Sequence, residues 1–444
     1  MALKVLQFVT EALGDASYLV VANGTAAAID PQRDVRALLA AAREHNASID
    51  YVLETHVHND YLSGARELAA LGARIAAPAK ADLEFPHLAL EDGAELQFGG
   101  ITLRAVAAPG HTHEHTAYVG VDERGHTRAA FTGGALLMGS AGRSDLLGPE
   151  HTADLTRLQW ETAQHIRGLL PSAASLFPTH GAGSFCSTTG STLERYGPLS
   201  TELTRNPALS SLTPEAFAAI QLAAPAPIPG YYRYMAPINR NGPKVYGEPP
   251  RPRLLSPEEV ATTTAAVVDV RPRASFAGSH IPGSIEIEES TSLLAYTGWL
   301  IPFNAPVVLV SEDRAQADRV TRDFFRIGYE DVRGYLPFRD WQLSRRPTAW
   351  LPHVDSARAR EILRTAEMPV LDTRFSSEQL ERPLPGALSL PLDQLTEWVD
   401  TAPARSLVVC ASGQRATMAA SVLLKSGRDA IALVQGGAEE LLRN

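Results

Sequence analysis

The sequence contains only two cysteines, Cys186 and Cys410, among 444 residues. Two thiols in a chain of this length do not form the disulfide framework of a secreted protein, so a reducing compartment is the simpler interpretation. No apolar run approaches the roughly 18 residues that a membrane span needs. The opening residues, MALKVLQFVTEALGD, contain Glu11 and lack the apolar core of a signal peptide. We therefore expect a cytoplasmic protein with no membrane partner.

Positive charge is also scarce, because 40 Lys and Arg against 50 Asp and Glu give a formal net charge of −10. An acidic surface repels phosphate groups, so we expect no nucleic acid as a partner. A chain of this length corresponds to about three domains, each long enough to bury a core. The sequence leaves open whether the protein forms a homo-oligomer.

Histidines lie in three loops that each follow an apolar strand. His56, His58 and Asp60 alternate in THVHND, His111 lies in PGHTHEHT, and His180 lies in PTHGAGS. Imidazoles gathered at one point are ligands that zinc and iron accept. We predict a metal site built on the three histidines at 56, 58 and 111, with the other two residues beside it.

These motifs, together with FTGG and GRSDL, resemble the metallo-β-lactamase fold. More narrowly, they resemble its persulfide dioxygenase and glyoxalase-like branch, and the later string YMAPINRNGP is typical of fusions of that branch with rhodanese. The resemblance covers essentially the whole chain. It implies an α/β fold with an αββα sandwich, one divalent metal (iron or zinc) and a low-molecular-weight thiol persulfide as substrate.

Two positions depart from the pattern of that family. Tyr61 stands where the motif H-x-H-x-D-H has its last histidine, and Gly134 stands where T-G-D has a metal-binding aspartate. The iron triad that the resemblance implies, His56, His111 and residue 134, is therefore broken. We expect a divalent metal held weakly by three neutral histidines, and we expect an aspartate at 134 to restore iron binding. A site for two metals is less favoured.

Two residues near these motifs are candidates for binding a thiol cofactor. Arg143 in GRSDL can pair with a cofactor carboxylate or with Asp145 of its own loop, and the structural role is favoured. Cys186 can carry a persulfide beside the metal pocket, or it can be a small buried apolar residue. Because side chains alternate, only some of the imidazoles at 111, 113 and 115 can face the pocket.

The C-terminal half contains an internal repeat. VVDVRPRASFAGSHIPGS begins at Val267 and VLDTRFSSEQLERPLPGA at Val370, and the same 13 positions separate the Asp from the Pro in each copy. Each copy continues into an apolar strand, a helix and a second strand, which predicts two tandem α/β units with parallel sheets. We therefore predict four segments: a metallo-β-lactamase-type domain at 1–206, a Pro-rich linker or wrapping arm at 207–253, and rhodanese-type domains at 254–350 and 351–444.

In the second copy the strand leads into Cys410, and the motif C-x-x-G-x-R with Gly413 and Arg415 opens a helix. A thiolate at this position is stabilised by backbone N–H groups, by the helix dipole and by the arginine, which makes it nucleophilic. The loop resembles that of rhodanese, because tyrosine phosphatases have one more residue between the cysteine and the arginine. In the first copy Ser311, Glu312 and Asp313 occupy the loop, so we predict a degenerate copy that acts as a spacer or docking domain.

The sequence therefore predicts an enzyme that processes sulfane sulfur, with Cys410 as the sulfurtransferase nucleophile and a small-molecule thiol or persulfide as its partner. The persulfide-dioxygenase-like metal domain is expected to be impaired at Gly134. Two alternatives stay open: a zinc-dependent, glyoxalase-like thioester hydrolase, and a non-catalytic sulfur carrier that passes sulfur to a protein.

Overall fold

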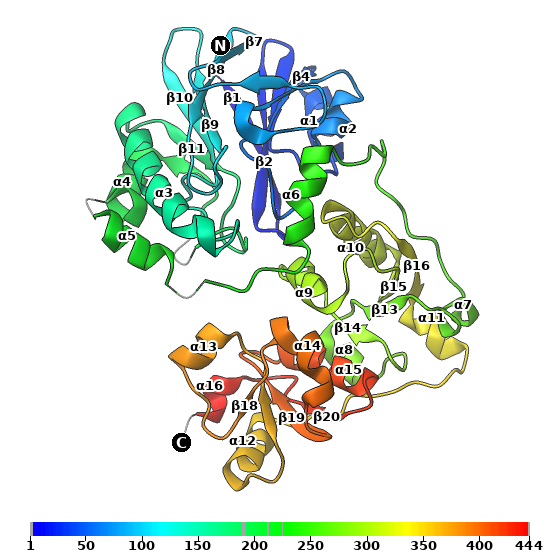
Figure 1. Ribbon diagram of the computed structural model, residues 1–444. Helices are drawn as coiled ribbons and strands as arrows, with labels where there is room; N and C mark the ends of the chain where they lie inside the picture. Colours follow the sequence, from blue (N-terminus) through cyan, green and yellow to red (C-terminus); the bar gives the residue numbers. More distant parts are fainter. Residues whose placement is uncertain (1–2, 189–191, 211–212, 224, 443–444) are drawn as a thin grey trace. The chain divides into compact units, whose positions relative to one another are not determined.

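The computed structural model describes residues 3–188, 192–210, 213–223 and 225–442. The chain divides into two compact units, Met1–Pro249 and Pro250–Asn444 (Figure 1). The segment that the sequence predicts as a linker or arm, 207–253, thus belongs almost entirely to the first unit. Among the described helices, none combines the length and the apolar character that crossing a membrane requires.

The first unit contains two six-stranded sheets. The first sheet has the order β1-β2-β3-β4-β5-β6, with β1 Lys4–Thr10, β2 Asp15–Ala22, β3 Thr25–Ile29, β4 Ser48–Leu53, β5 Arg74–Pro78 and β6 Leu88–Leu90. The second has the order β12-β11-β10-β9-β8-β7, with β7 Glu95–Phe98, β8 Ile101–Ala107, β9 Thr116–Val121, β10 Thr127–Gly133, β11 Ser175–Pro178 and β12 Gly197–Pro198.

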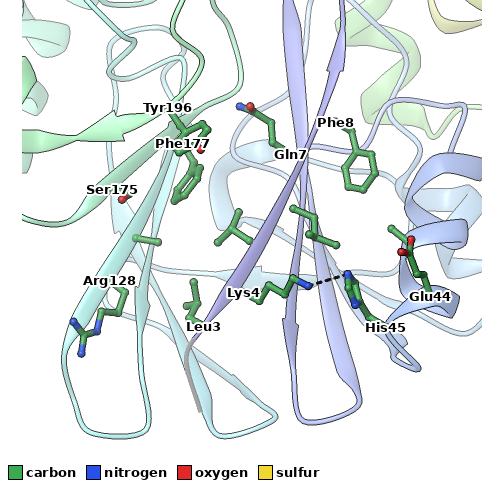
Figure 2. A pocket seen from close by; sticks show the side chains of 14 residues that line it. Leu3, Lys4, Gln7, Phe8, Glu44, His45, Arg128, Ser175, Phe177 and Tyr196 are labelled. Atoms are coloured by element: carbon green, nitrogen blue, oxygen red, sulfur yellow. Dashed lines mark hydrogen bonds between the residues drawn. The ribbon is translucent and has the colours of Figure 1, made fainter.

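Strand β1 lies at the edge of the first sheet, and a pocket of about 690 Å³ runs beside it (Figure 2). Apolar side chains of Leu3, Phe8 and Phe177 line the pocket, and Lys4 Nζ lies 3.2 Å from His45 Nε2 at its rim. None of the residues predicted to bind metal or sulfur lines it.

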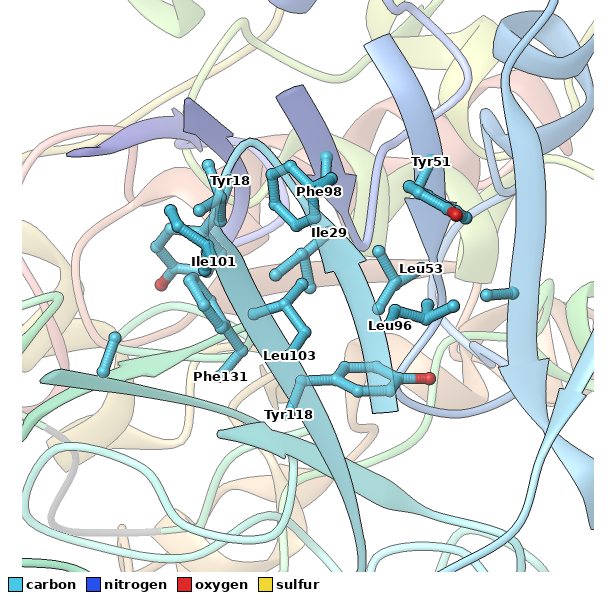
Figure 3. Close-up of a cluster of buried hydrophobic side chains, with 14 of the residues drawn as sticks. Tyr18, Ile29, Tyr51, Leu53, Leu96, Phe98, Ile101, Leu103, Tyr118 and Phe131 are labelled. Carbon is cyan, nitrogen blue, oxygen red and sulfur yellow. The ribbon is translucent and has the colours of Figure 1, made fainter. Parts of the chain in front are cut away.

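Aromatic and aliphatic side chains from both sheets interlock to form the central core (Figure 3). Tyr18, Ile29 and Leu53 come from the first sheet, and Leu103 and Phe131 from the second. Helices cover the outer faces, where α1 Arg36–Glu44 and α2 Ala65–Ala69 pack on the first sheet. On the second sheet lie α3 Pro149–Leu169, α4 Leu199–Arg205 and α5 Pro214–Gln221. The first unit is therefore the predicted αββα sandwich.

Local sequence signals account for several of these elements. Asn23 and Gly24 join β2 to β3 with φ of 44° and 79°, as expected for a two-residue hairpin turn. The Pro-rich segment behaves differently from a free linker. It contains α5 and the helix α6 (Tyr232–Asn241), and α6 buries Tyr232 and Met235.

The second unit contains two four-stranded parallel sheets with the same strand order. The first sheet, ordered β14-β13-β15-β16, comprises β13 Ala266–Asp269, β14 Ile285–Glu286, β15 Val307–Ser311 and β16 Val332–Pro337. The second, ordered β18-β17-β19-β20, comprises β17 Val370–Asp372, β18 Leu388–Ser389, β19 Arg405–Val409 and β20 Asp429–Ala432.

Helices surround both sheets of the second unit. Those of the first copy are α7 Pro257–Ala261, α8 Arg273–Gly278, α9 Leu293–Leu300, α10 Arg314–Arg326 and α11 Phe338–Leu343. Those of the second copy are α12 Ser356–Thr365, α13 Ser376–Glu381, α14 Leu395–Trp398, α15 Gln414–Lys425 and α16 Ala438–Leu441.

The repeat extends to individual contacts. In the first copy Asp269 accepts hydrogen bonds from Arg271 at 2.9 and 2.6 Å. In the second copy Asp372 accepts the equivalent bonds from Arg374 at 3.0 and 2.6 Å. In both copies the arginine also donates to the carbonyl eight residues further on. The two tandem α/β domains predicted from the sequence are present.

Candidate functional site

The predicted metal ligands meet at one end of the sandwich, in loops that follow β4, β8 and β11. His56, His58 and His180 each offer a ligand atom within 4.8 Å of the others, and His111, His180 and Cys186 form a second such set. All of these side chains are buried. The structure thus brings together the four predicted histidines, and it places Cys186 among them.

One nitrogen of each of two imidazoles is held by the protein. His111 Nδ1 lies 2.6 Å from the carbonyl oxygen of Arg143, to which it must donate. His56 Nδ1 lies 2.9 Å from the hydroxyl of Thr55, and that hydroxyl donates to Asp30. Both rings therefore keep Nε2 unprotonated, which is the usual arrangement of metal-binding histidines. Nε2 of His56 lies 3.4 Å from Nε2 of His180, so the unprotonated nitrogen faces another imidazole of the cluster.

In His58 the protein engages Nε2 instead of Nδ1. Its Nε2 lies 3.1 Å from Glu54, 3.3 Å from Asp30 and 3.1 Å from the hydroxyl of Tyr61. Burial alone would lower the pKa of His58, but the charge of Asp30 and the hydrogen bonds to both carboxylates raise it well above its usual value. Its Nδ1 has no hydrogen-bond partner within the described part of the chain. A cation on Nδ1, either a proton or a metal, is therefore favoured.

Asp60 and Asp15 flank His180. His180 Nδ1 lies 2.9 Å from Asp15 and 3.3 Å from Asp60. Burial alone would lower the pKa of His180, but the two carboxylates raise it to about 10. Burial and the charge of Asp60 together raise the pKa of Asp15 to about 8. These buried acids need a positive charge beside them, because an unpaired buried carboxylate is strongly disfavoured.

The two departures from the family pattern have structural consequences. A Cβ built on Gly134 would lie 2.3 Å from Cδ2 of His111, so the ring of His111 occupies the space that a side chain at 134 would need. Tyr61 is fully buried; its hydroxyl donates to the carbonyl oxygen of Asp30 and lies 3.1 Å from Nε2 of His58. The residues present fit one divalent metal held mainly by imidazoles, and they do not fit the triad of two histidines and a carboxylate at 134.

Sequence reasoning missed part of this centre. His115, which alternation left undecided, is buried and stacks on His56 with ring centroids 4.9 Å apart, whereas His113 is exposed. The Nε2 of His115 accepts a hydrogen bond of 2.9 Å from the N–H of Gly134. The acids Asp15, Asp30 and Glu54 were also missed. Only the position of Glu54, directly before THVHND, gave a signal that could have found one of them.

The two predicted cofactor residues lie close together. Arg143 binds both oxygens of Asp145 at 2.8 and 2.7 Å and donates to the carbonyl oxygen of Ala226 at 2.6 Å. Its loop therefore engages the guanidinium, as the structural role requires. The Sγ of Cys186 lies 3.8 Å from the hydroxyl of Tyr232, and burial raises the pKa of this thiol well above its usual value.

In the second unit Cys410 lies between β19 and α15, as predicted. The N–H of Gly413 donates to Cys410 Sγ at 3.1 Å. Gly413 has φ of +88°, and a Cβ there would come within 2.0 Å of the carbonyl oxygen of Val434. The glycine of the motif is therefore required both by its backbone angle and by the close approach of a second chain segment.

Arg415 is fixed beside this loop. It donates to Glu378 through both terminal nitrogens, and its guanidinium lies 4.5 Å above the ring of Phe375. Burial alone would lower the pKa of Arg415, but Glu378 and the neighbouring Cys410 raise it. A permanent positive charge thus lies next to the thiol.

The first copy lacks this arrangement. The hydroxyl of Ser311 donates to the carbonyl oxygen of Asp313 at 2.9 Å, and Asp313 caps α10 by accepting from the N–H of Gln316 at 2.8 Å. The repeat places Ser275 where the second copy has Glu378, so both members of the Arg–Glu pair are absent.

The first copy nevertheless contacts the Cys410 loop. Gln414 donates to the hydroxyl of Ser290 at 3.0 Å, and the hydroxyl of Tyr296 lies 3.4 Å from Gln414 Oε1. Arg273 donates to the carbonyl oxygen of Ser412 at 3.4 Å. The degenerate copy therefore packs against the loop that carries the thiol.

Comparison with known proteins agrees with this architecture. Residues 12–180 match the metallo-beta-lactamase superfamily, and residues 256–336 match the rhodanese-like domain. A crystal structure of a metallo-beta-lactamase from Staphylococcus aureus subsp. aureus COL is 27% identical, with a TM-score of 0.70, and covers 76% of this chain and 100% of its own.

Curated relatives match a shorter stretch. Hydroxyacylglutathione hydrolase of Acidiphilium cryptum (strain JF-5) is 40% identical over 106 residues, which is 23% of this chain and 43% of that protein. A hydroxyacylglutathione hydrolase-like protein of Mus musculus is 33% identical over 37% of this chain and 56% of its own length. The chain thus spans only about half the length of these relatives. It joins a metallo-β-lactamase-superfamily domain at residues 12–180 to a rhodanese-like domain at residues 256–336.

Proposed function

We propose that this chain is an enzyme that processes sulfane sulfur, with Cys410 as the nucleophile of a sulfurtransferase. The observation that supports this most directly is the geometry of the Cys410 loop. The thiol accepts an N–H from Gly413 at the start of α15 and lies beside the charged Arg415. Both features stabilise a thiolate or a persulfide anion.

The proposed transfer proceeds in two displacements. The Cys410 thiolate attacks the outer sulfur of thiosulfate or of a low-molecular-weight persulfide. The donor S–S bond breaks, and its electron pair leaves with sulfite or with the donor thiolate, so Cys410 becomes a persulfide. A thiolate or cyanide acceptor then attacks the terminal sulfur, and the Cys410 thiolate is regenerated without an external oxidant.

In the N-terminal domain we propose a thiol-derived small molecule as substrate and one divalent metal, iron or zinc, as cofactor. A metal held there would polarise a bound sulfur or carbonyl group and activate a bound water. Thr55 and the carbonyl of Arg143 orient His56 and His111 for that role, and Asp15 and Asp60 keep a proton on Nδ1 of His180. Because no carboxylate stands at 134, oxidation of persulfides by iron and oxygen is expected to be weak.

The thiol test compares Cys410→Ser with Cys186→Ser in the full chain. Transfer of sulfur from thiosulfate to cyanide, followed as thiocyanate, should disappear in Cys410→Ser and persist in Cys186→Ser. Transfer at the unmodified rate by Cys410→Ser would overturn the assignment. A persulfide that forms on Cys410 but turns over slowly with every small acceptor would instead support the sulfur-carrier alternative.

A second candidate for the N-terminal domain is a zinc-dependent thioester hydrolase. It is supported by the cluster of histidine ligands and by relatives named as hydroxyacylglutathione hydrolases. Metal analysis of the purified chain, combined with oxygen uptake on glutathione persulfide and hydrolysis of a hydroxyacylglutathione thioester, separates the two reactions. Zinc with hydrolysis favours this candidate, and iron with oxygen uptake favours the dioxygenase.

A further inference from the structure

The string YMAPINRNGP takes no part in either site described above, and it forms α6 and the residues that follow it. This helix lies more than 50 residues beyond the last histidine loop in sequence, yet it buries four side chains in the first unit: Tyr232, Met235, Ala236 and Asn239. Ala236 packs against Val57, which lies between the two histidines of THVHND. The helix is therefore in contact with the metal-site loop.

Asn239 makes the most specific of these contacts. Its Nδ2 donates to the carbonyl oxygens of His58 at 2.9 Å and Tyr61 at 2.8 Å, and its Oδ1 accepts from the N–H of Ser63 at 2.9 Å. The side chain is only 5% exposed. Both amide hydrogens and the amide oxygen are used, and no other side chain of this size supplies two donors and an acceptor in this way.

Charged side chains of the sandwich hold the residues after α6 in place. The pairs are Arg66 Nη1 to Gly242 O at 2.8 Å, Arg33 Nη2 to Lys244 O at 2.8 Å, and Glu67 Oε1 from Tyr246 N at 2.8 Å. Arg33 and Glu67 are buried, and these backbone groups hydrogen-bond with their charged ends. The chain is therefore held against the sandwich on both sides of Asn239, by Ala236 before it and by residues 242–246 after it.

We infer that Asn239 is a positioning residue of the metal centre. By holding the backbone at 58, 61 and 63, it fixes the turn that carries His58 and Asp60, so that Nδ1 of His58 and the carboxylate of Asp60 face the other ligand atoms. This inference rests on the proposal that the histidine cluster binds a divalent metal. It assigns to YMAPINRNGP a role in metal affinity, although this string lies far from the histidine motifs in the sequence.

The test measures metal affinity in the full chain, without reference to turnover. The metal-free protein is titrated with Co²⁺, and binding is followed by visible absorption and by competition with a chelator. Asn239→Asp keeps the size and the acceptor for Ser63 but loses both donors, and Asn239→Ala removes all three bonds. Arg233→Ala is the matched control, because Arg233 lies on the exposed side of the same helix and donates to Tyr234.

Both Asn239 variants should bind Co²⁺ about 10- to 100-fold more weakly, as expected when a group that orients a ligand is lost. Their visible spectra should also change, whereas Arg233→Ala should match the unmodified chain. Unchanged affinity in Asn239→Asp overturns the inference alone. Absence of Co²⁺ binding by the unmodified chain overturns the metal assignment as well. If neither variant gives a folded first unit in thermal melts, the role is global rather than local, and the inference is wrong.

Discussion

Glycine at position 134 has a steric role as well as a chemical one. The ring of His111 is held by its hydrogen bond to the carbonyl of Arg143, and it lies where a Cβ at 134 would come within 2.3 Å of Cδ2 and 2.6 Å of Cγ. The sequence shows only that a carboxylate is missing at this position. It does not show that a neighbouring imidazole fills the space, because that contact joins two loops separated by the strands β9 and β10.

This contact changes the outcome expected for Gly134→Asp. Instead of restoring iron, the new side chain should displace His111 and lower the content of every divalent metal, measured by elemental analysis after reconstitution. Gly134→Ala is the matched control, since it adds the same Cβ without a carboxylate and should show a similar loss. More iron in Gly134→Asp than in the unmodified chain, with no gain in Gly134→Ala, would show that the loop can make room.

Glu378 is the residue on which the position of Arg415 depends. Burial alone would raise the pKa of Glu378, but the hydrogen bonds and charge of Arg415 lower it below its usual 4.5. A lowered carboxyl pKa stabilises the folded state above pH 4.5, and this contribution is lost as the pH falls through the folded pKa. Because Glu378 is partly exposed, we expect Glu378→Gln to cost about 1–2 kcal/mol at pH 7.

The measurement is urea unfolding of the second unit at pH 7 and at a pH well below 4.5, in parallel with thiocyanate formation. The difference in free energy of unfolding between the unmodified chain and Glu378→Gln should shrink in acid. Sulfur transfer should slow several-fold in Glu378→Gln at pH 7. Glu381→Gln, on the exposed end of the same helix, serves as control. If the difference in stability between the unmodified chain and Glu378→Gln does not change with pH, the ionisation of Glu378 is not its cause.

Among the structural elements, the sequence predicts those whose determining residues lie close together in the chain. The Asn23-Gly24 turn and the repeated Asp–Arg pairs depend on residues within a few positions of one another. The helix α6 was missed because Pro237 lies inside it and its stability comes from packing on a distant loop. Periodicity within a Pro-rich segment carries no information about such a partner.

The same elements explain why one substitution should not revive the first copy. Ser311→Cys, tested with Cys410→Ser, should show no thiocyanate formation above background. Asp313 caps α10 at the place where a persulfide would bind, and this loop lacks the motif C-x-x-G-x-R with its arginine. Ser311→Cys alone should keep the unmodified rate, which checks that the change is tolerated. Appreciable transfer by the double variant would show that the first loop binds anions after all.

At the scale of the whole molecule, the two candidate sites lie in different units, and the sequence predicts the content of each site better than the extent of the first unit. Motif spacing identified the histidines at 56, 58, 111 and 180 and the thiol loop at Cys410. The domain boundary at 206 rests on composition alone. The structure places residues up to 249 in the first unit, where hydrogen bonds join them to the histidine loop and to Arg33.

Fragments of the chain test that boundary. Residues 1–249 should fold alone and bind Co²⁺ with the affinity of the full chain, and residues 250–444 should retain sulfur transfer from thiosulfate to cyanide, because Cys410, Arg415 and Glu378 all lie within them. Residues 1–206 should melt at a lower temperature and bind Co²⁺ poorly. Without α6 and the residues after it, buried Arg33 and Glu67 lose backbone partners, and the turn after His58 loses three hydrogen bonds. A 1–206 fragment as stable and as tight in Co²⁺ binding as 1–249 would show that the arm is dispensable.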